Sequence, residues 1–242
     1  MIDAPARPTP VEQGYTPLRT YRYERKFLVD ELLPHQVEAI IKLHPRLFYA
    51  PYPPRCVNNL YFDTPDMENY YDNVNGATHR RKVRVRWYGA PFGEVSRPVL
   101  EIKVKDGLVG TKYTHSLVPF CLERGFCNHD FRSVAMNSGL PENVRCNLRN
   151  LDVVLFNRYY RSYYATRDGH FRVTLDSEMA FHKANGAFGN AFIHHQINYR
   201  DLVVELKYEV DQEPHADRVA SFFPFRVTRN SKYVQGIERV YF

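Results

Sequence analysis

The 242-residue sequence has little cysteine and no long apolar run, and these absences exclude several classes of protein. Its four cysteines, Cys56, Cys121, Cys127 and Cys146, form no Cys-x-x-Cys pair and have no histidine at zinc-finger spacing. We therefore expect no zinc finger, and reduced thiols as in a cytoplasmic protein. No apolar stretch approaches the roughly 20 residues that span a bilayer, and the N-terminus lacks a signal-peptide core. Recruitment to a membrane would need a membrane-protein partner.

Tryptophan is scarce, but tyrosine and phenylalanine are abundant, and the chain is basic. One tryptophan stands against 18 tyrosines and 16 phenylalanines, and aromatic residues favour β-strands. A hydrophobic share of 44% is enough to bury a sizeable core. The net charge of +6 predicts an anionic partner, such as phosphate, nucleic acid or an acidic membrane surface.

Residues 1–19 are predicted to form a flexible tail, because they contain four prolines and Gly14. One domain is expected over residues 20–242, since neither a linker nor a repeat interrupts it. Alternation predicts strands at 22–27, 58–63, 79–88, 99–105, 111–118, 153–166, 171–176 and 202–210. Helical spacing predicts helices at 34–43 and 214–222, and a third that runs to 74 with Thr64 as N-cap and Pro65 in its first position. The fold class is therefore mainly β (α+β): an antiparallel, eight-stranded, tunnel-like β-barrel with peripheral helices.

Charged and apolar side chains separate by parity along five of these strands. Successive side chains of a strand point to opposite faces of the sheet, so parity assigns each residue to a face. The ionic face holds Arg22, Glu24, Lys26, Lys82, Arg84, Arg86, Glu101, Lys103, Lys105, Arg172, Thr174, Asp176, Glu205, Lys207 and Glu209. A solvated face explains this pattern in a single strand. Its repetition in five strands favours a ligand-binding surface.

Carboxylates alternate with basic residues on the ionic face, and this favours a phosphate ligand with a metal ion over nucleic acid. A sheet that binds nucleic acid gains nothing from interleaved glutamates. Mg²⁺ or Mn²⁺ needs oxygen donors, whereas phosphate oxygens need lysine and arginine. If the ionic face turns inward, so many like charges are costly to bury unless an anion accompanies them. The pattern therefore predicts a polyphosphate or nucleoside triphosphate in a basic pocket.

Eight short motifs follow one another in order between Tyr21 and Phe242. They are YERKF (23–27), YFDT (61–64), KVRVRWYG (82–89), LEIKVK (100–105), RYYRSYY (158–164), RVTLD (172–176), VVELKY (203–208) and SKYVQG (231–236). Together they resemble the VTC-type polyphosphate polymerase domain of the triphosphate tunnel metalloenzyme (CYTH-like) superfamily. The resemblance implies an antiparallel barrel whose basic interior binds a triphosphate, with Mn²⁺ or Mg²⁺ held by glutamate.

The resemblance also implies roles for individual residues. The catalytic residues would be Lys26, Arg84, Arg86, Lys103, Arg161, Arg172 and Lys232. Further substrate contacts would come from Lys105, Lys207, Arg229, Tyr159 and Ser231, and metal ligands from Glu205, Glu24 and Glu101. The superfamily often begins with ExExK, but here Arg22 leaves only Glu24 in that motif. This departure puts a two-metal hydrolytic site in doubt.

Three activities fit these residues. The leading hypothesis is a polyphosphate polymerase that transfers the γ-phosphate of ATP onto inorganic polyphosphate. The first alternative is a metal-dependent triphosphatase, which needs a further carboxylate to activate water, and Glu24, Glu101 or Glu209 are candidates. The second alternative is a non-catalytic module that binds polyphosphate or a nucleotide. Nucleic acid is not expected as a partner.

Overall fold

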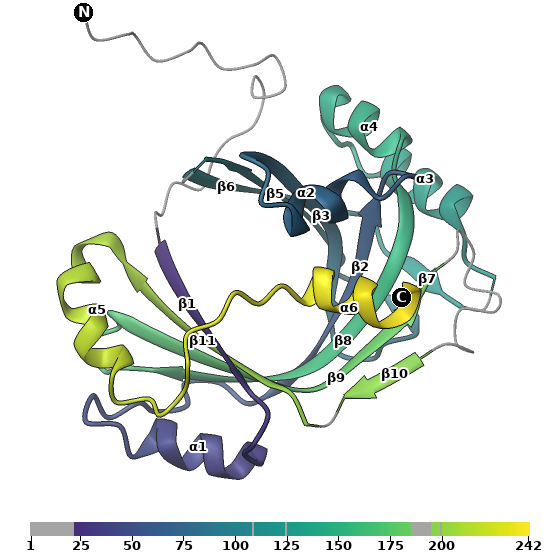
Figure 1. Cartoon of the computed structure of the whole chain (residues 1–242). Coiled ribbons are helices and arrows are strands. Elements are labelled where there is room, and N and C mark those ends of the chain that lie inside the picture. The colour runs from purple at the N-terminus through teal and green to yellow at the C-terminus, as the bar shows by residue number, and fades with distance from the viewer. Residues whose placement is uncertain (1–21, 108, 124, 185–194, 199) are drawn as a thin grey trace, which may run out of the picture.

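Eight long antiparallel strands form one curled sheet in the computed structural model, which describes residues 22–107, 109–123, 125–184, 195–198 and 200–242 (Figure 1). The order across the sheet is β1 (Arg22–Val29), β11 (Leu202–Glu209), β9 (Phe171–Lys183), β8 (Asp152–Ala165), β2 (Arg55–Asp63), β3 (His79–Tyr88), β5 (Val99–Asp106) and β6 (Val109–Ser116). A short β10 (His195–Asn198) extends β9, and β4 (Gly93–Val95) pairs with β7 (Phe120–Leu122). The mainly β prediction is confirmed. The predicted tail, residues 1–19, lies outside the described residues.

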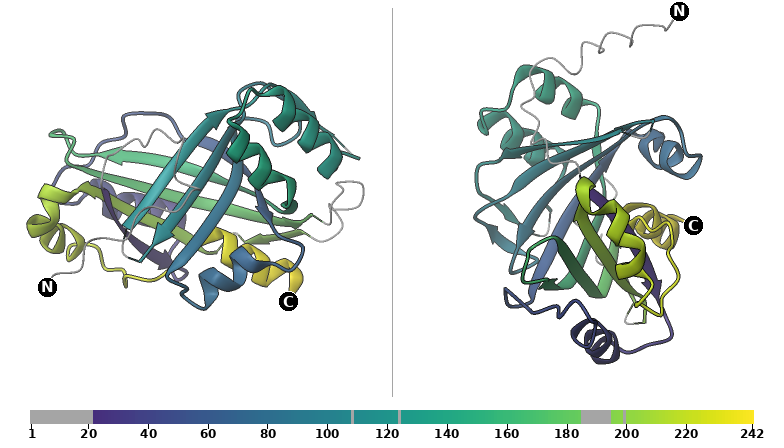
Figure 2. Two further views of the ribbon diagram at one scale, coloured as in Figure 1. Left: turned by 90° about the horizontal axis from the view of Figure 1, so that it is seen from above. Right: turned by 90° about the vertical axis from the view of Figure 1, so that its left-hand side faces the viewer.

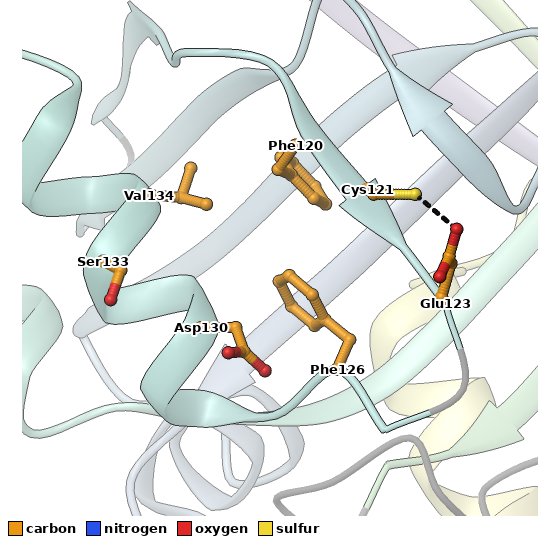
Figure 3. A pocket seen from close by; sticks show the side chains of 7 residues that line it. All are labelled: Phe120, Cys121, Glu123, Phe126, Asp130, Ser133 and Val134. Carbon is orange, nitrogen blue, oxygen red and sulfur yellow. Dashed lines mark hydrogen bonds between the residues drawn. The ribbon is translucent and has the colours of Figure 1, made fainter.

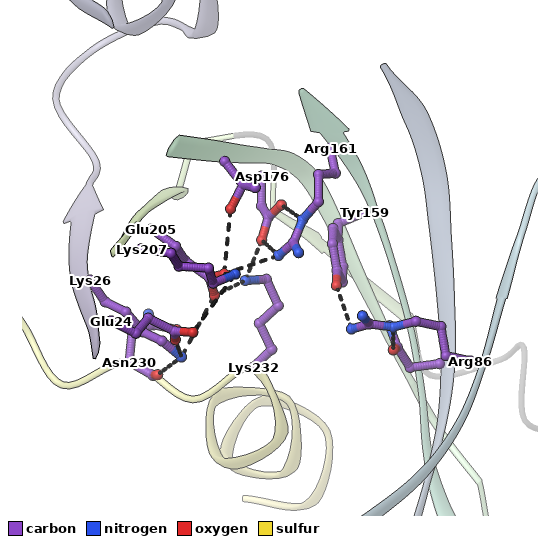
Figure 4. Close-up of polar contacts among 12 residues, drawn as sticks. Glu24, Lys26, Arg86, Tyr159, Arg161, Asp176, Glu205, Lys207, Asn230 and Lys232 are labelled. Atoms are coloured by element: carbon purple, nitrogen blue, oxygen red, sulfur yellow. Dashed lines mark hydrogen bonds and ion pairs between the residues drawn. The ribbon is translucent and has the colours of Figure 1, made fainter. Parts of the chain in front are cut away.

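The sheet curls into a half-barrel. Within the described ranges, its end strands β1 and β6 do not pair with each other. The predicted parity is confirmed, because neighbouring strands align their ionic residues in rows: Lys26 lies opposite Glu205, and Arg84 lies opposite Glu101. The side chains of Lys26 and Glu205 point toward the inside of the curve (Figure 4).

The convex face of the sheet is apolar and carries four helices. On one half, α1 (Pro34–Lys42) and α5 (Glu213–Ala220) contribute Val37, Ile41 and Val219 to a core with Phe27 and Leu206. On the other half, α3 (Asn128–Asn137) and α4 (Glu142–Arg149) pack on a core that includes Val85, Trp87 and Leu100 (Figure 2). Since these helices cover the apolar parity, the ionic parity is left on the concave side.

Helix α2 (Glu68–Val74) begins three residues later than the sequence suggests, so the predicted start at Pro65 is wrong. The Asp63 carboxylate, at the end of β2, accepts hydrogen bonds from the backbone N–H groups of Asn69 (2.9 Å) and Tyr70 (3.0 Å). Thr64 Oγ1 accepts one from the N–H of Glu68 (3.0 Å). Because these acceptors satisfy the free N–H groups of the first turn, the helix starts where its backbone meets them.

Helix α6 (Lys232–Tyr241) lies against the concave side, where the sequence analysis assigned no element (Figure 1). Its Tyr233 and Ile237 form a third apolar cluster with residues of β8, β9 and β11. The hydroxyl of Tyr233 donates a hydrogen bond to Asp63, which also supports α2. Helix α6 therefore closes part of the concave side and brings its first residue, Lys232, to the ionic face.

Gly236 allows α6 to approach the sheet this closely. A Cβ atom at this position would lie 2.5 Å from Leu155 Cδ2 and 2.6 Å from Phe181 Cδ1. We expect Gly236→Val to lower the free energy of unfolding by about 2–3 kcal/mol, as overpacking a filled core does. Urea unfolding measures this change. Glu238→Ala, at an exposed position of the same helix, is the control and should change stability little. Equal stability of the two variants would contradict the close approach.

Candidate active site on the concave face

Glu205 lies at the centre of a first ionic cluster, on β11 (Figure 4). Its carboxylate contacts the ammonium groups of Lys207 (2.7 Å), Lys26 (3.6 Å) and Lys232 (3.6 Å), and the guanidinium of Arg161 (3.3 Å). Burial raises the pKa of a carboxyl, but these four cations outweigh burial and hold the pKa of Glu205 well below its ordinary range. Glu205 is therefore ionised at neutral pH.

Asp176 of β9 completes the first cluster, although it was not among the predicted site residues. It is fully buried and binds Arg161 through two hydrogen bonds of 2.6 and 2.7 Å. Its second oxygen lies 2.5 Å from Lys232 Nζ. Parity places Asp176 on the ionic face, but the sequence gives no sign that it would join Arg161 and Lys232.

A second cluster is centred on Glu101 of β5. Arg84 contacts the Glu101 carboxylate at 2.5 and 2.7 Å, Arg86 lies 3.9 Å from it, and Lys112 of β6 forms an ion pair with it. Burial opposes ionisation of Glu101, but Arg84, Arg86 and Lys112 lower its pKa far below the usual range. Lys112 was missed by the sequence analysis, since no motif includes it.

Tyr159 connects the two clusters. Its hydroxyl accepts a hydrogen bond from Arg86 (3.2 Å), and its ring faces Arg161 (5.2 Å) and Lys232 (4.9 Å) (Figure 4). The structure thus brings together most of the predicted residues. Those that take part in the two clusters or connect them are Lys26, Arg84, Arg86, Tyr159, Arg161, Glu205, Lys207, Lys232, Glu24 and Glu101.

Five predicted residues lie outside both clusters, and two of them, Lys103 and Ser231, are described with Lys82 below. Arg172 and Arg229 are exposed, and Lys105 lies opposite Arg80 near the end of β5. Arg172 is nevertheless paired with Lys207 across β9 and β11, next to the first cluster. Their roles in binding substrate stay predictions, as do the catalytic roles of the clustered residues.

Lys82 and Lys103 are basic residues on this face with lowered pKa values. Burial and the neighbouring Lys26 lower the pKa of Lys82 to about 7. The Lys103 side chain is exposed, yet partial burial inside the curve of the sheet and the charge of Arg84 lower its pKa below the ordinary range. Lys82 Nζ donates a hydrogen bond to Ser231 Oγ (2.8 Å), which connects β3 to the N-cap of α6. Ser231 therefore lies at the site, where it accepts a hydrogen bond from Lys82, a residue that was not among the predicted site residues.

These two lysines predict that binding of ATP takes up protons above pH 7. Between pH 7 and about 10 the folded protein holds Lys82 largely neutral while the unfolded chain protonates it. The unfolded state binds more protons in this range, so stability of the free protein rises with pH. A bound anion favours the charged lysine, so affinity for ATP should fall as the pH rises from 7 to 9.

Calorimetry of ATP binding at pH 8.5, in two buffers with different ionisation heats, measures this proton uptake. We expect uptake of about one to two protons, and a smaller uptake in Lys82→Gln. The same uptake in the variant would show that Lys82 keeps its charge in the free protein.

Glu24 and Glu205, two of the three predicted metal ligands, lie close together and share two lysines. Both contact Lys26 (2.9 and 3.6 Å) and Lys207 (3.7 and 2.7 Å). Among the described residues no group of three or more His, Cys, Asp or Glu side chains is arranged to hold a metal. Mg²⁺ typically takes one or two carboxylates and completes its shell with substrate phosphates and water. Glu101, the third predicted ligand, lies instead in the second cluster.

A pocket also lies between β7 and α3, on the convex side (Figure 3). It is lined by Phe120, Cys121, Glu123, Phe126, Asp130, Ser133 and Val134. It contains none of the predicted site residues and no basic side chain. The concave face therefore remains the candidate active site.

The geometry defines a class of protein: a curled antiparallel sheet with a tunnel-like, strongly basic interior. The sequence matches the VTC domain family over residues 21–241, and the chain belongs to this family. No curated protein sequence matches it. No helix in the described part of the chain is long and apolar enough to cross a membrane.

The solved structures that match this chain include two from bacteria and one from a virus. A candidate adenylate cyclase of Vibrio parahaemolyticus is 14% identical, with a TM-score of 0.49 over 89% of this chain and 98% of the other. A second candidate adenylate cyclase, of Bacillus halodurans, is 14% identical, with a TM-score of 0.46 over 89% and 95%. The Mimivirus capping enzyme triphosphatase is 11% identical, with a TM-score of 0.33 over 84% and 89%.

Proposed function

We propose that the chain is a metal-dependent polyphosphate polymerase that transfers the γ-phosphate of ATP onto a growing inorganic polyphosphate chain. One observation carries the proposal: the concave face has far more positive than negative side chains. In the two clusters seven basic residues accompany four carboxylates, namely Lys26, Arg84, Arg86, Lys112, Arg161, Lys207 and Lys232 with Glu24, Glu101, Asp176 and Glu205. A bound anion would add the charges of Lys82 and Lys103, whose pKa values are lowered in the free protein. A polyanion along this face compensates that excess charge.

The two clusters suit phosphoryl transfer because they lie on opposite sides of one concave face and could contact the same phosphate chain from both sides. Lys26, Arg161 and Lys232 would hold phosphates from one side, and Arg84 and Arg86 from the other. Positioning and charge stabilisation dominate this reaction. An oxygen of the terminal phosphate of polyphosphate forms a bond to the γ-phosphorus, the bond from that phosphorus to the β,γ-bridging oxygen breaks, and ADP leaves. When bound at Glu24 and Glu205, Mn²⁺ or Mg²⁺ would neutralise charge on the phosphate oxygens.

Transfer to phosphate needs no general base, since the attacking oxygen is already anionic. A triphosphatase needs a group that activates water. Glu24 contacts Lys26 and Lys207, and Glu101 contacts Arg84 and Lys112, so each is held ionised by cations. These contacts lower the basicity of both carboxylates, and this favours transfer to phosphate over hydrolysis.

The test is an assay of the purified protein with ATP and Mn²⁺. We expect long polyphosphate chains and one ADP for each phosphate added. Release of free phosphate without chains would instead identify a triphosphatase, and binding without turnover would identify a non-catalytic module. Arg84→Gln should abolish elongation. Arg132→Gln, at an exposed arginine of α3, is the matched control and should keep it.

A further inference from the structure

Four side chains at one border of the concave face form an aromatic cluster around an arginine. The guanidinium of Arg55 lies over the rings of Tyr88 (4.4 Å to the centroid) and Tyr163 (4.9 Å). Arg55 Nε donates a hydrogen bond to the Tyr163 hydroxyl (3.0 Å), and Tyr52 meets Tyr163 edge to face at 6.3 Å. Tyr52 and Tyr88 are exposed, so flat aromatic surface faces solvent.

This aromatic cluster adjoins the first ionic cluster. Arg55, the first residue of β2, is paired with Arg161 of β8 across the sheet. Tyr163 is paired with Thr174, whose hydroxyl contacts Glu205 (3.4 Å). Tyr88 follows Arg86 by two residues on β3 and therefore lies on the same face. A ligand with phosphates on Arg161 and Arg86 would have its next group at these rings.

The chemistry of the aromatic cluster differs from that of the rest of the face. Every basic residue of the two ionic clusters contacts a carboxylate, whereas the described contacts of Arg55 are all with tyrosines. Tyrosine rings and a planar guanidinium are surfaces on which nucleobases stack. A bare phosphate chain has no group that would use them.

We propose that Tyr52, Arg55, Tyr88 and Tyr163 form a nucleobase site that binds the adenine of ATP beside the triphosphate. This inference rests on the proposed function and extends it, because it makes ATP a better ligand than inorganic triphosphate. The ribose would lie between the rings and Arg161. Stacking of one base raises affinity by roughly 10-fold.

The test compares dissociation constants of ATP and inorganic triphosphate by calorimetry, without turnover. In the wild-type protein ATP should bind about 10-fold more tightly than inorganic triphosphate. Tyr88→Leu should remove most of this advantage and leave the affinity for triphosphate unchanged, and Tyr88→Phe should retain it. Tyr71→Leu is a matched control, since Tyr71 on α2 is as exposed as Tyr88 (49% and 47%).

Two results would overturn the nucleobase site: equal affinity of the wild-type protein for both ligands, or equal weakening of both by Tyr88→Leu. Thermal unfolding of each variant establishes that it is folded. Failure of the polymerase proposal is seen separately, as ATP binding without chain elongation. In that case the binding comparison still decides whether the rings hold a base.

Discussion

Glutamine in place of Glu205 is expected to lower the rate of chain elongation by at least about 100-fold. The substitution preserves size but replaces a charged oxygen ligand with a weaker amide. A metal ion contributes several kcal/mol to stabilising the transferring phosphoryl group, and about 2.7 kcal/mol corresponds to 100-fold in rate. The rate should be measured with saturating ATP across a range of Mn²⁺ concentrations. The affinity for Mn²⁺ should fall in parallel. It is measured by electron paramagnetic resonance, which detects the free ion.

Two further substitutions separate a metal ligand from a general charge effect. Glu38→Gln makes the same chemical change on α1, where Glu38 contacts Lys42, and should alter neither rate nor Mn²⁺ affinity. Glu101→Gln removes a carboxylate charge from the second cluster. A fall in Mn²⁺ affinity in this variant would identify Glu101 as a further metal ligand. If Glu205→Gln kept both the rate and the affinity for Mn²⁺, the role of Glu205 as a metal ligand would be wrong.

The strands and the orientation of their side chains could be predicted because alternation is a local property of the chain. The strand predicted at residues 79–88 has the observed bounds of β3, and Lys82, Arg84 and Arg86 share a face as parity requires. Burial of the alternate residues Val83 and Val85 under α3 and α4 then fixes which face turns outward. A shift of the pairing register by one residue would turn the charged side chains to the convex face and the apolar ones to the concave face. The charge pattern therefore specifies the register.

Features that depend on contacts between distant segments could not be predicted. The start of α2 was misplaced because its N–H groups are satisfied by Asp63 from the preceding strand. Motifs named Lys232, but the position of α6 depends on Tyr233 meeting Asp63, 170 residues away in sequence. Parity placed Glu101, Asp176 and Glu205 on one face, yet strand order decides that Glu101 meets Arg84 while the other two share Arg161.

Strand order also explains why the two ionic clusters lie on opposite sides of one concave face. The first cluster is built by β1, β11, β9 and β8 together with Lys232 of α6, and the second by β3, β5 and β6 on the other side of β2. Curling of the sheet turns the two sets toward each other, and Tyr159 of β8 reaches Arg86 of β3 across β2. The sequence motifs therefore mark one site whose halves come from opposite ends of the strand order.

Asparagine in place of Asp176 is expected to destabilise the free protein strongly and to make it depend on a bound anion. Asp176 is fully buried between Arg161 and Lys232, each only 9% exposed. Removing one partner of such a buried ion pair typically costs about 3–5 kcal/mol, because the remaining charges are left uncompensated. Urea unfolding with and without inorganic triphosphate measures this, and triphosphate should stabilise the variant more than the wild type, since its charge replaces that of the carboxylate.

The matched control is Asp217→Asn on α5. Asp217 also binds an arginine, Arg25, at 2.7 Å, but its side chain is 88% exposed, against 0% for Asp176. An exposed ion pair contributes at most about 1 kcal/mol, so the control should unfold almost like the wild type and gain nothing extra from triphosphate. Equal, small effects of the two substitutions would mean that water already compensates Arg161 and Lys232. The excess positive charge of the concave face would then need no anion to compensate it, and the physical argument for a polyphosphate ligand would fail.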